Sequence, residues 1–196
     1  MRALGISGIN VTAPHKVEVM KYIDVVTDGA KKLGSVNTVV NRDGKLYGYN
    51  TDADGFCMAL TKAGIEIENS RILIIGAGGV VRPTLIRLID NKPKSITVVN
   101  RTKSKAKTLA EDILKSTGFE VNTEIDKLEF DIVINTTSAG MEPQENVMPI
   151  ENIEEINDLS FINENTAAVD MIYNPDKTLF LQEAEKRGAK ILNGLG

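Results

Sequence analysis

The chain of 196 residues is 42% hydrophobic and 26% charged, with a formal net charge of −4. This balance is typical of a globular protein, and the lack of a basic block argues against a nucleic-acid-binding protein. No apolar run approaches the roughly 20 residues of a membrane helix, no signal-peptide pattern opens the chain, and the single Cys57 excludes an internal disulfide. One histidine and one cysteine also leave too few ligands for a structural zinc site. We therefore expect a soluble, cytoplasmic α/β protein without a metal.

Residues 1–66 predict only part of a domain. The expected strands are 36–41 and 46–49, joined by a hairpin turn at Arg42-Asp43-Gly44-Lys45, and the expected helices are 15–23 and 54–62. So short a segment buries too small a fraction of its surface to fold as an independent mixed domain. We expect the boundary within 64–70, so that a second domain spans 67–196.

From residue 71 onward, short apolar strands alternate with amphipathic helices. The expected strands are 72–75, 96–99, 131–135, 167–172 and 190–192, and the expected helices are 80–89, 104–115 and 178–187. Strands that are apolar on both faces are typical of a parallel sheet covered by helices on each side. This part of the chain therefore predicts a doubly wound parallel-sheet (Rossmann) domain, the plan that binds dinucleotides.

A glycine-rich loop, Gly76-Ala77-Gly78-Gly79, follows the first of these strands and opens a helix. Gly76 permits a tight turn, and Gly78 lets the backbone approach a pyrophosphate, which the free N–H groups at the helix start would favour. Val81 stands at the third fingerprint position, where glycine or alanine is usual. A tight turn with no ligand is the alternative interpretation.

The end of the second strand indicates which dinucleotide binds. An NAD site places an acidic residue there for the ribose hydroxyls. In this chain the first acidic residue after the strand at 96–99 is Glu111. The strand instead ends in Asn100-Arg101-Thr102-Lys103-Ser104-Lys105. Arg101 can pair with a 2′-phosphate, and Lys103 or Lys105 can add positive charge. The pattern favours NADP over NAD, and a solvated basic turn is the alternative.

Three compact polar motifs precede the glycine loop: Asn10-Val11-Thr12-Ala13-Pro14-His15-Lys16, Gly34-Ser35-Val36-Asn37-Thr38 and Tyr49-Asn50-Thr51-Asp52. A lysine near a carboxylate is a workable proton-transfer pair beside a dinucleotide site, because lysine can exchange a proton with an alcohol oxygen while hydride moves. Lys16 and Asp52 are the candidates. The alternatives are a solvated surface lysine and an aspartate that caps a helix.

Together with Gly76-Ala77-Gly78-Gly79 and Asn100-Arg101-Thr102, these motifs resemble those of the shikimate dehydrogenase family, which includes the quinate/shikimate dehydrogenases. Three further motifs follow in the same order: Asn-x-Thr-Ser-x-Gly-Met at 135–141, Asp170-Met171-Ile172-Tyr173-Asn174-Pro175 and Asn193-Gly194-Leu195-Gly196. The resemblance spans almost the whole chain. It implies an NADP-dependent oxidoreductase that reversibly reduces 3-dehydroshikimate to shikimate, a small molecule of aromatic amino-acid biosynthesis.

The resemblance also implies roles for individual residues. Lys16 would be the catalytic proton donor or acceptor, with Asp52 as its partner. How the two residues divide the proton transfer stays open. The implied substrate-binding residues are Thr12, Asn37 and Tyr173. The implied cofactor-binding residues are Gly76, Ala77, Gly78, Gly79 and Val80 at the pyrophosphate, Asn100, Arg101, Thr102 and Lys105 at the 2′-phosphate, and Thr136, Met171 and Gly194 at the nicotinamide. The family often has arginine where Lys105 stands, and lysine keeps the charge but loses the bidentate fork.

The chain departs from the family pattern at both ends. The family carries an earlier segment with two serines that hold the substrate carboxylate and a later helix with a substrate-binding glutamine, and these 196 residues include neither. If these 196 residues are the whole molecule, the substrate carboxylate has lost its main donors, and we expect it to bind more weakly, because an unpaired anion binds poorly. Two alternatives therefore stay open: a quinate/shikimate dehydrogenase that uses NAD or NADP, and a non-catalytic dinucleotide-binding fragment. Family members occur as monomers and dimers, which leaves a homodimer open.

Overall fold

The computed structural model describes residues 1–156 and 158–195, and the chain forms two compact units, Met1–Gly55 and Phe56–Gly196. The division falls inside helix α2 (Asp52–Lys62), earlier in the chain than the boundary expected within 64–70. Helix α2 runs without a break across the division, and most of its residues belong to the second unit. The glycine and polar residues that suggested a linker come after this helix.

The first unit is built on a four-stranded mixed sheet with the order β1-β3-β4-β2. The strands are β1 (Gly8–Asn10), β2 (Val25–Val26), β3 (Thr38–Arg42) and β4 (Lys45–Tyr49). The hairpin between β3 and β4 is confirmed, and its turn places Asp43 and Gly44 at positive φ, 52° and 83°. Helix α1 (Asp28–Leu33) begins after Thr27, whose hydroxyl accepts the N–H of Ala30, and ends at Gly34. A short 3-10 turn, η1 (Arg2–Leu4), opens the chain.

The segment 15–23, expected to be helical, forms no α-helix. The segment instead contains a short 3-10 helix, η2 (Glu18–Tyr22). The β-branched Val17 and Val19 lose side-chain freedom in a helix, which lowers the helical propensity of so short a stretch. Val19 and Met20 pack instead against the small apolar core that includes Val36 and Val39.

The second unit is built on a five-stranded parallel sheet with the order β6-β5-β7-β8-β9, which confirms the doubly wound α/β fold. Its strands are β5 (Arg71–Ile75), β6 (Ser95–Val99), β7 (Ile132–Asn135), β8 (Ala167–Asp170) and β9 (Lys190–Leu192). Its helices after α2 are α3 (Val81–Asp90), α4 (Lys103–Thr117) and α5 (Leu179–Lys186). A single bridge between Thr97 and Asn122 extends the sheet beyond β6.

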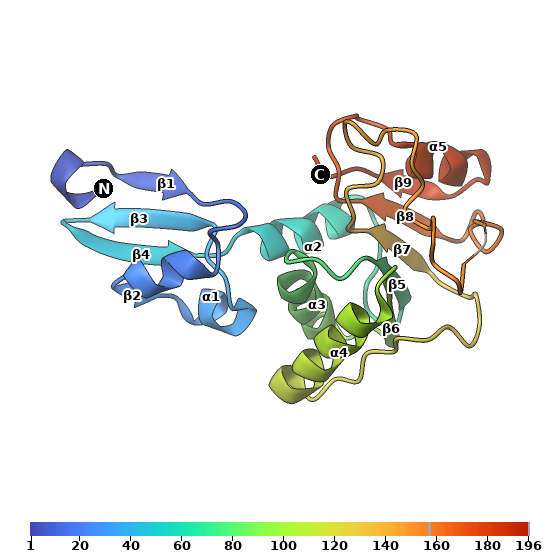
Figure 1. Ribbon diagram of the computed structural model, residues 1–196, viewed down its shortest axis with the longest axis horizontal. Helices are drawn as coiled ribbons and strands as arrows, with labels where there is room; N and C mark the ends of the chain where they lie inside the picture. Colours follow the sequence, from blue (N-terminus) through green and yellow to red (C-terminus); the bar gives the residue numbers. More distant parts are fainter. Residues whose placement is uncertain (157, 196) are drawn as a thin grey trace. The chain divides into compact units, whose positions relative to one another are not determined.

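Both faces of this sheet are buried. The four residues from Ile72 to Ile75 on β5 are fully buried, and Leu73 and Ile75 share a core with Phe180 and Leu181 of α5. Alternation along the strand turns Ile72 and Ile74 to the opposite face, which α3 and α4 cover (Figure 1). The two groups of helices lie on opposite faces because right-handed crossovers leave β5 and β8 in opposite directions across the sheet.

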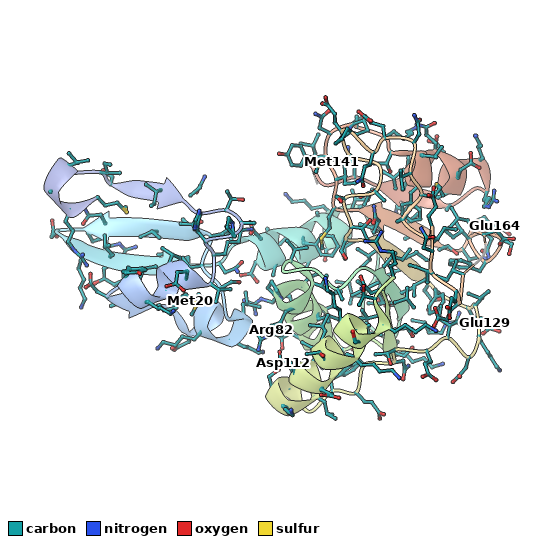
Figure 2. The ribbon with its side chains drawn as sticks, viewed as in Figure 1. Met20, Arg82, Asp112, Glu129, Met141 and Glu164 are labelled. Carbon is teal, nitrogen blue, oxygen red and sulfur yellow. The ribbon has the colours of Figure 1, made fainter. Side chains whose placement is uncertain are left out.

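Helices α3 and α4 are also joined by charge. The guanidinium of Arg82 on α3 donates from Nε to Asp112 on α4 at 2.6 Å, and Figure 2 labels both side chains between the two helices.

In the described part of the chain, no helix is long and apolar enough to cross a membrane. Among the same residues, no three His, Cys, Asp or Glu side chains gather as metal ligands.

The strand order reverses between β5 and β7. From β5 the chain passes to β6 on one side of the sheet, whereas β7, β8 and β9 follow on the other side. In open parallel sheets, ligands bind outside the carboxyl ends of the strands at such a reversal. The loops after Ile75 and Asn135 are therefore the part of this unit in which a ligand site is expected.

Candidate functional site

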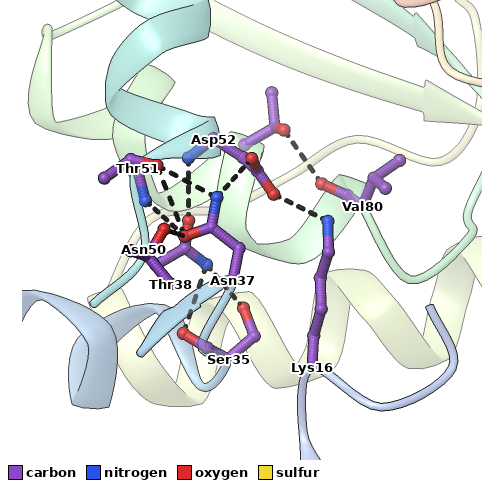
Figure 3. Close-up of polar contacts among 9 residues, drawn as sticks. Lys16, Ser35, Asn37, Thr38, Asn50, Thr51, Asp52 and Val80 are labelled. Carbon is purple, nitrogen blue, oxygen red and sulfur yellow. Dashed lines mark hydrogen bonds and ion pairs between the residues drawn. The ribbon is translucent and has the colours of Figure 1, made fainter. Parts of the chain in front are cut away.

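In the first unit, Lys16 and Asp52 form a direct ion pair. The Nζ of Lys16 donates to Oδ2 of Asp52 at 2.6 Å (Figure 3). The carbonyl of Lys16 accepts the N–H of Val36 at 2.8 Å, which ties the lysine to the segment that leads into β3. Asp52 is the first residue of α2. The lysine side chain is 26% exposed and the aspartate 52%, so the pair stays accessible to a ligand.

Asn37 orients the carboxylate of Asp52. Its Nδ2 donates to Oδ1 of Asp52 and to the hydroxyl of Thr51 at 3.0 Å (Figure 3). Its Oδ1 accepts the N–H of Thr51 at 3.0 Å and the hydroxyl of Thr38 at 2.9 Å. One oxygen of Asp52 thus faces Asn37 and the other faces Lys16. Asn37 is buried, and its amide holds the geometry of the ion pair, a task that the sequence motifs did not reveal.

Ser35 and Asn50 stabilise the start of α2 at Asp52 through hydrogen bonds, a role that the sequence did not predict for either residue. Oδ1 of Asn50 accepts the N–H of Asp52 at 3.1 Å, and Nδ2 of Asn50 donates to the Ser35 hydroxyl at 2.8 Å. Both side chains are buried. Their position inside the polar motifs could have indicated such a role, because polar residues that are buried need hydrogen-bond partners.

Thr12 lies in the exposed turn that leads to Lys16. Its carbonyl accepts the N–H of His15 at 2.9 Å. The same turn therefore presents Thr12 and the lysine on one short segment. Its proposed role in substrate binding stays a prediction.

In the second unit, the glycine loop is fixed at the ends of three strands. Gly76 adopts a φ of 116°, and its N–H donates to the carbonyl of Val99 at 2.8 Å. The hydroxyl of Thr136 donates to the carbonyl of Ile75 at 2.8 Å. A side chain on Gly76 would overlap with the Thr136 hydroxyl, so only glycine fits this turn.

Gly78 and Gly79 have a different explanation. A Cβ atom on either would meet no described atom within 4 Å, and neither residue has a positive φ. Nothing in the described chain requires glycine at these positions. Close approach of a ligand does require it, because a side chain would hold a pyrophosphate away from the N–H groups at the start of α3. The loop from Gly76 to Val80 therefore fits a dinucleotide.

The loop opens into a groove of about 450 Å³ at the carboxyl ends of β5, β6 and β7. Of the expected cofactor residues, those that line it are Gly76, Ala77, Gly78, Asn100, Arg101, Thr102, Lys105 and Thr136. The far wall of the groove consists of Thr137, Ser138, Ala139, Gln144 and residues 147–149 and 151–153. None of these residues was predicted to bind the cofactor, although 137–139 belong to the motif at 135–141. The part of the wall from Gln144 onward is irregular loop and has no periodic pattern from which it could be predicted.

The basic segment after β6 divides into two groups. Arg101 and Lys105 are exposed and line the groove. Lys103 instead pairs with Glu154 at 2.8 Å and Glu155 at 2.9 Å, and these contacts raise the pKa of Lys103. The side chain of Asn100 donates to the Thr102 carbonyl at 3.0 Å and shapes the turn. Arg101 and Lys105 are thus the cations placed to meet a 2′-phosphate.

Met171 and Gly194 come together beyond the carboxyl end of β8. The N–H of Met171 donates to the Asn135 carbonyl at 3.0 Å, and a Cβ on Gly194 would overlap with the carbonyl of Met171. Tyr173 follows two residues later and is 63% exposed. Gly196, the last residue of the expected motif, lies outside the described residues.

Comparisons with known proteins match both units. A family model described as shikimate dehydrogenase substrate binding domain matches residues 1–39, and one described as shikimate / quinate 5-dehydrogenase matches residues 58–175. A curated NADP(+) shikimate dehydrogenase of Geobacillus sp. strain WCH70 is 45% identical over 201 residues, which cover 100% of this chain and 70% of the relative. One of Nitrosopumilus maritimus is 40% identical over 99% of this chain and 70% of its own length.

Solved structures agree. A shikimate dehydrogenase in complex with NADP+ has a TM-score of 0.88 at 39% identity, over 100% of this chain and 68% of that one. The shikimate dehydrogenase from Thermus thermophilus in complex with NADP(H) and shikimate has a TM-score of 0.81 at 33% identity, over 97% and 68%. A quinate dehydrogenase from Corynebacterium glutamicum in complex with NAD has a TM-score of 0.85 at 28% identity, over 98% and 68%.

Proposed function

The chain belongs to the shikimate dehydrogenase family, and on that premise we propose that it is an NADP-dependent oxidoreductase that interconverts 3-dehydroshikimate and shikimate. The observation that carries the proposal is the Lys16–Asp52 ion pair, held in place by the amide of Asn37. A general acid next to a fixed carboxylate is what the reduction of a ketone to an alcohol requires from the protein.

The proposed chemistry divides between the cofactor and the chain. Bound nicotinamide supplies or accepts the hydride. Lys16 donates a proton to the carbonyl oxygen as it becomes an alcohol, and the reverse reaction returns that proton to the lysine. Asp52 keeps Nζ in place through the 2.6 Å contact. Thr12, Asn37 and Tyr173 are proposed to contact the substrate.

Several features of the second unit support NADP as the cofactor. The loop from Gly76 to Val80 would hold the pyrophosphate, because its glycines leave space and α3 offers free N–H groups. Arg101 and Lys105 would hold the 2′-phosphate, with Asn100 and Thr102 shaping the turn between strand and helix. Thr136, Met171 and Gly194 are proposed to lie at the nicotinamide end. A cytoplasmic location and a homodimer stay predictions.

The test combines turnover and cofactor binding in one purified sample. NADP+ and shikimate are mixed with the chain, and the absorbance of NADPH is followed, with NAD+ and quinate as parallel arms. The Lys16→Ala variant is expected to lose about 10²- to 10⁴-fold in kcat and to keep its affinity for NADP+. The matched control is Lys21→Ala, which removes an exposed lysine paired with Glu18 at 2.8 Å, and full activity is expected.

Each outcome separates the alternatives. Turnover that survives Lys16→Ala contradicts the catalytic role of the lysine. Faster turnover with NAD+ and quinate identifies a quinate/shikimate dehydrogenase. A folded chain that binds NADP+ but reduces none of it in the presence of shikimate is a dinucleotide-binding module without this activity.

A further inference from the structure

A buried carboxylate lies at the C-terminal end of β8, and the reaction proposed above does not use it. Asp170 ends β8, is fully buried, and stands directly opposite Asn135 at the end of β7. Nδ2 of Asn135 lies 3.1 Å from both carboxylate oxygens. The hydroxyl of Thr178 donates to Oδ2 at 2.7 Å, and the N–H of Ile172 donates to Oδ1 at 2.9 Å.

These contacts connect Asp170 to two loops. Through Asn135 it reaches the loop after β7, because Oδ1 of Asn135 accepts the N–H of Thr137 at 3.0 Å and its hydroxyl at 2.8 Å. Nδ2 of Asn135 also donates to the carbonyl of Ala139 at 3.2 Å. Through Ile172 it fixes the segment after β8. The first of these loops lines the cofactor groove, and the second contains Met171.

The donors around Asp170 are neutral groups, although a buried charge is costly unless it is well paired. Burial raises the pKa of Asp170, while the hydrogen bonds from Ile172, Thr178 and Asn135 lower it. Capping of α5 does not require this carboxylate, since the Thr178 hydroxyl itself accepts the N–H of Leu181. The contacts of this buried carboxylate with two loops are better explained if Asp170 positions those loops.

We propose that Asp170 is a positioning residue for the nicotinamide end of the cofactor, which holds the loop over 136–140 and the segment over 171–173 in the shape that receives the ring. The proposal rests on the proposed function, because it needs a dinucleotide in the groove. It assigns Asn135 and Thr178 to the same task, as the two side chains that hold the carboxylate.

The experiment separates the two ends of the cofactor without requiring turnover. Adenosine 2′,5′-bisphosphate probes the adenosine end by calorimetry, and NADPH probes both ends through the fluorescence of its nicotinamide. For Asp170→Asn we expect bisphosphate affinity within about twofold of the wild type, NADPH affinity lower by about tenfold, and the loss of the nicotinamide fluorescence change on binding. Thr178→Ser, which keeps the hydroxyl, should behave as the wild type, and Thr178→Val should fall in between.

The matched control is Asp131→Asn, which removes a carboxylate next to the opposite end of β7, where it pairs with Arg71 at 3.0 Å. It should lower stability and leave both ligands bound as in the wild type. An unchanged NADPH signal in Asp170→Asn overturns the proposal, and so does an equal loss of both ligands in Asp170→Asn and Thr178→Val. A wild-type chain that binds neither ligand overturns the proposed cofactor site, and the inference with it.

Discussion

Asn37 illustrates at the scale of one residue how a side chain can matter through its neighbour. Its Nδ2 donates to Asp52, and its Oδ1 accepts from Thr51 and Thr38, so the amide is held on both sides. Without it, the Asp52 carboxylate would keep the contact to Lys16 and lose the one that fixes its rotation. A carboxylate that can rotate holds the lysine less well, which should affect the proton transfer more than the binding of cofactor.

We therefore expect Asn37→Ala to lower kcat/KM for shikimate by about 10- to 100-fold, the worth of a hydrogen bond to a charged group. NADP+ affinity, measured by calorimetry, should not change. The control is Asn41→Ala on β3, the strand that begins directly after Asn37; the Asn41 side chain contacts the Ile6 carbonyl and the Gly44 N–H in the hairpin. It should lower the melting temperature and leave kcat unchanged. Wild-type kcat/KM in a folded Asn37→Ala protein would contradict this account.

The pairing of Lys16 with Asp52 was predictable from the motifs, and the structure confirms that the two side chains meet. Their catalytic roles stay predictions. The part played by Asn37, Asn50 and Ser35 was not predictable in the same way. Hydrogen-bond partners depend on how β3 is placed beside the start of α2, which is a property of the folded unit and not of residue spacing.

At the scale of elements, the N-terminus of α4 is joined to the loop that walls the cofactor groove. Lys103 is the first residue of α4, and its partners Glu154 and Glu155 follow directly on residues 151–153 of the groove wall. The carboxylate of Glu155 is 21% exposed, and the contact with Lys103 lowers the pKa of Glu155. These ion pairs hold the wall in place; Lys103 is therefore not free to bind a phosphate.

Removal of either side of these ion pairs should have the same consequence. We expect Lys103→Met, and the double variant Glu154→Gln/Glu155→Gln, each to weaken NADP+ and NAD+ alike by about two- to fivefold, as for exposed ion pairs. Fluorescence titration with both cofactors checks this. Lys107→Met on the same helix, whose partner Glu124 lies 3.7 Å away, is the control.

A direct contact between Lys103 and the 2′-phosphate predicts the opposite pattern. Lys103→Met would then weaken NADP+ alone, and the glutamine variants would strengthen it by freeing the lysine. Observation of that pattern would refute the interpretation of Lys103 as a structural tie.

Secondary structure could be predicted from the sequence where an apolar run or a helical period extends over several residues. Continuous apolar runs on β5, β6 and β7 and the helical periodicity of α3 indicated a parallel sheet with its helices, as observed. Strands β1 and β2 have three and two residues, too few for a periodic pattern. They form because β3 and β4 offer them partners, and that information lies far away in the chain.

At the scale of the second unit, the cofactor groove and a stabilising ion-pair network lie at opposite ends of the parallel strands. The groove lies at the carboxyl ends of the strands, while an ion-pair network lies at their amino ends. There Arg71 contacts Asp131 through Nε at 3.1 Å and Nη2 at 3.0 Å, and Glu129 through Nη1 at 2.8 Å. This network joins the starts of β5 and β7, two neighbouring strands in the interior of the sheet, so its loss should alter stability without altering cofactor binding.

The network should also make stability depend on pH. The Arg71 guanidinium holds the pKa of Asp131 below its ordinary value, as nearby hydrogen bonds do for Asp158 and Glu183. The folded chain therefore binds these protons less tightly than the unfolded chain, so the stabilisation is full above the ordinary carboxyl pKa of about 4 and is lost as pH falls through the lower folded values. Asp170 works the other way, because its raised pKa makes its ionisation costly as pH rises.

We expect Asp131→Asn to lower the free energy of unfolding at pH 7 by at most about 1 kcal/mol, since Asp131 is 41% exposed and solvent screens the pair. The difference from the wild type should shrink below pH 4 and vanish near pH 2, because both chains then lack the charge. Urea unfolding across this pH range measures it, with exposed Glu120→Gln as the control. A difference that persists at pH 2 would mean that Asp131 stabilises the sheet by its shape and not by its charge.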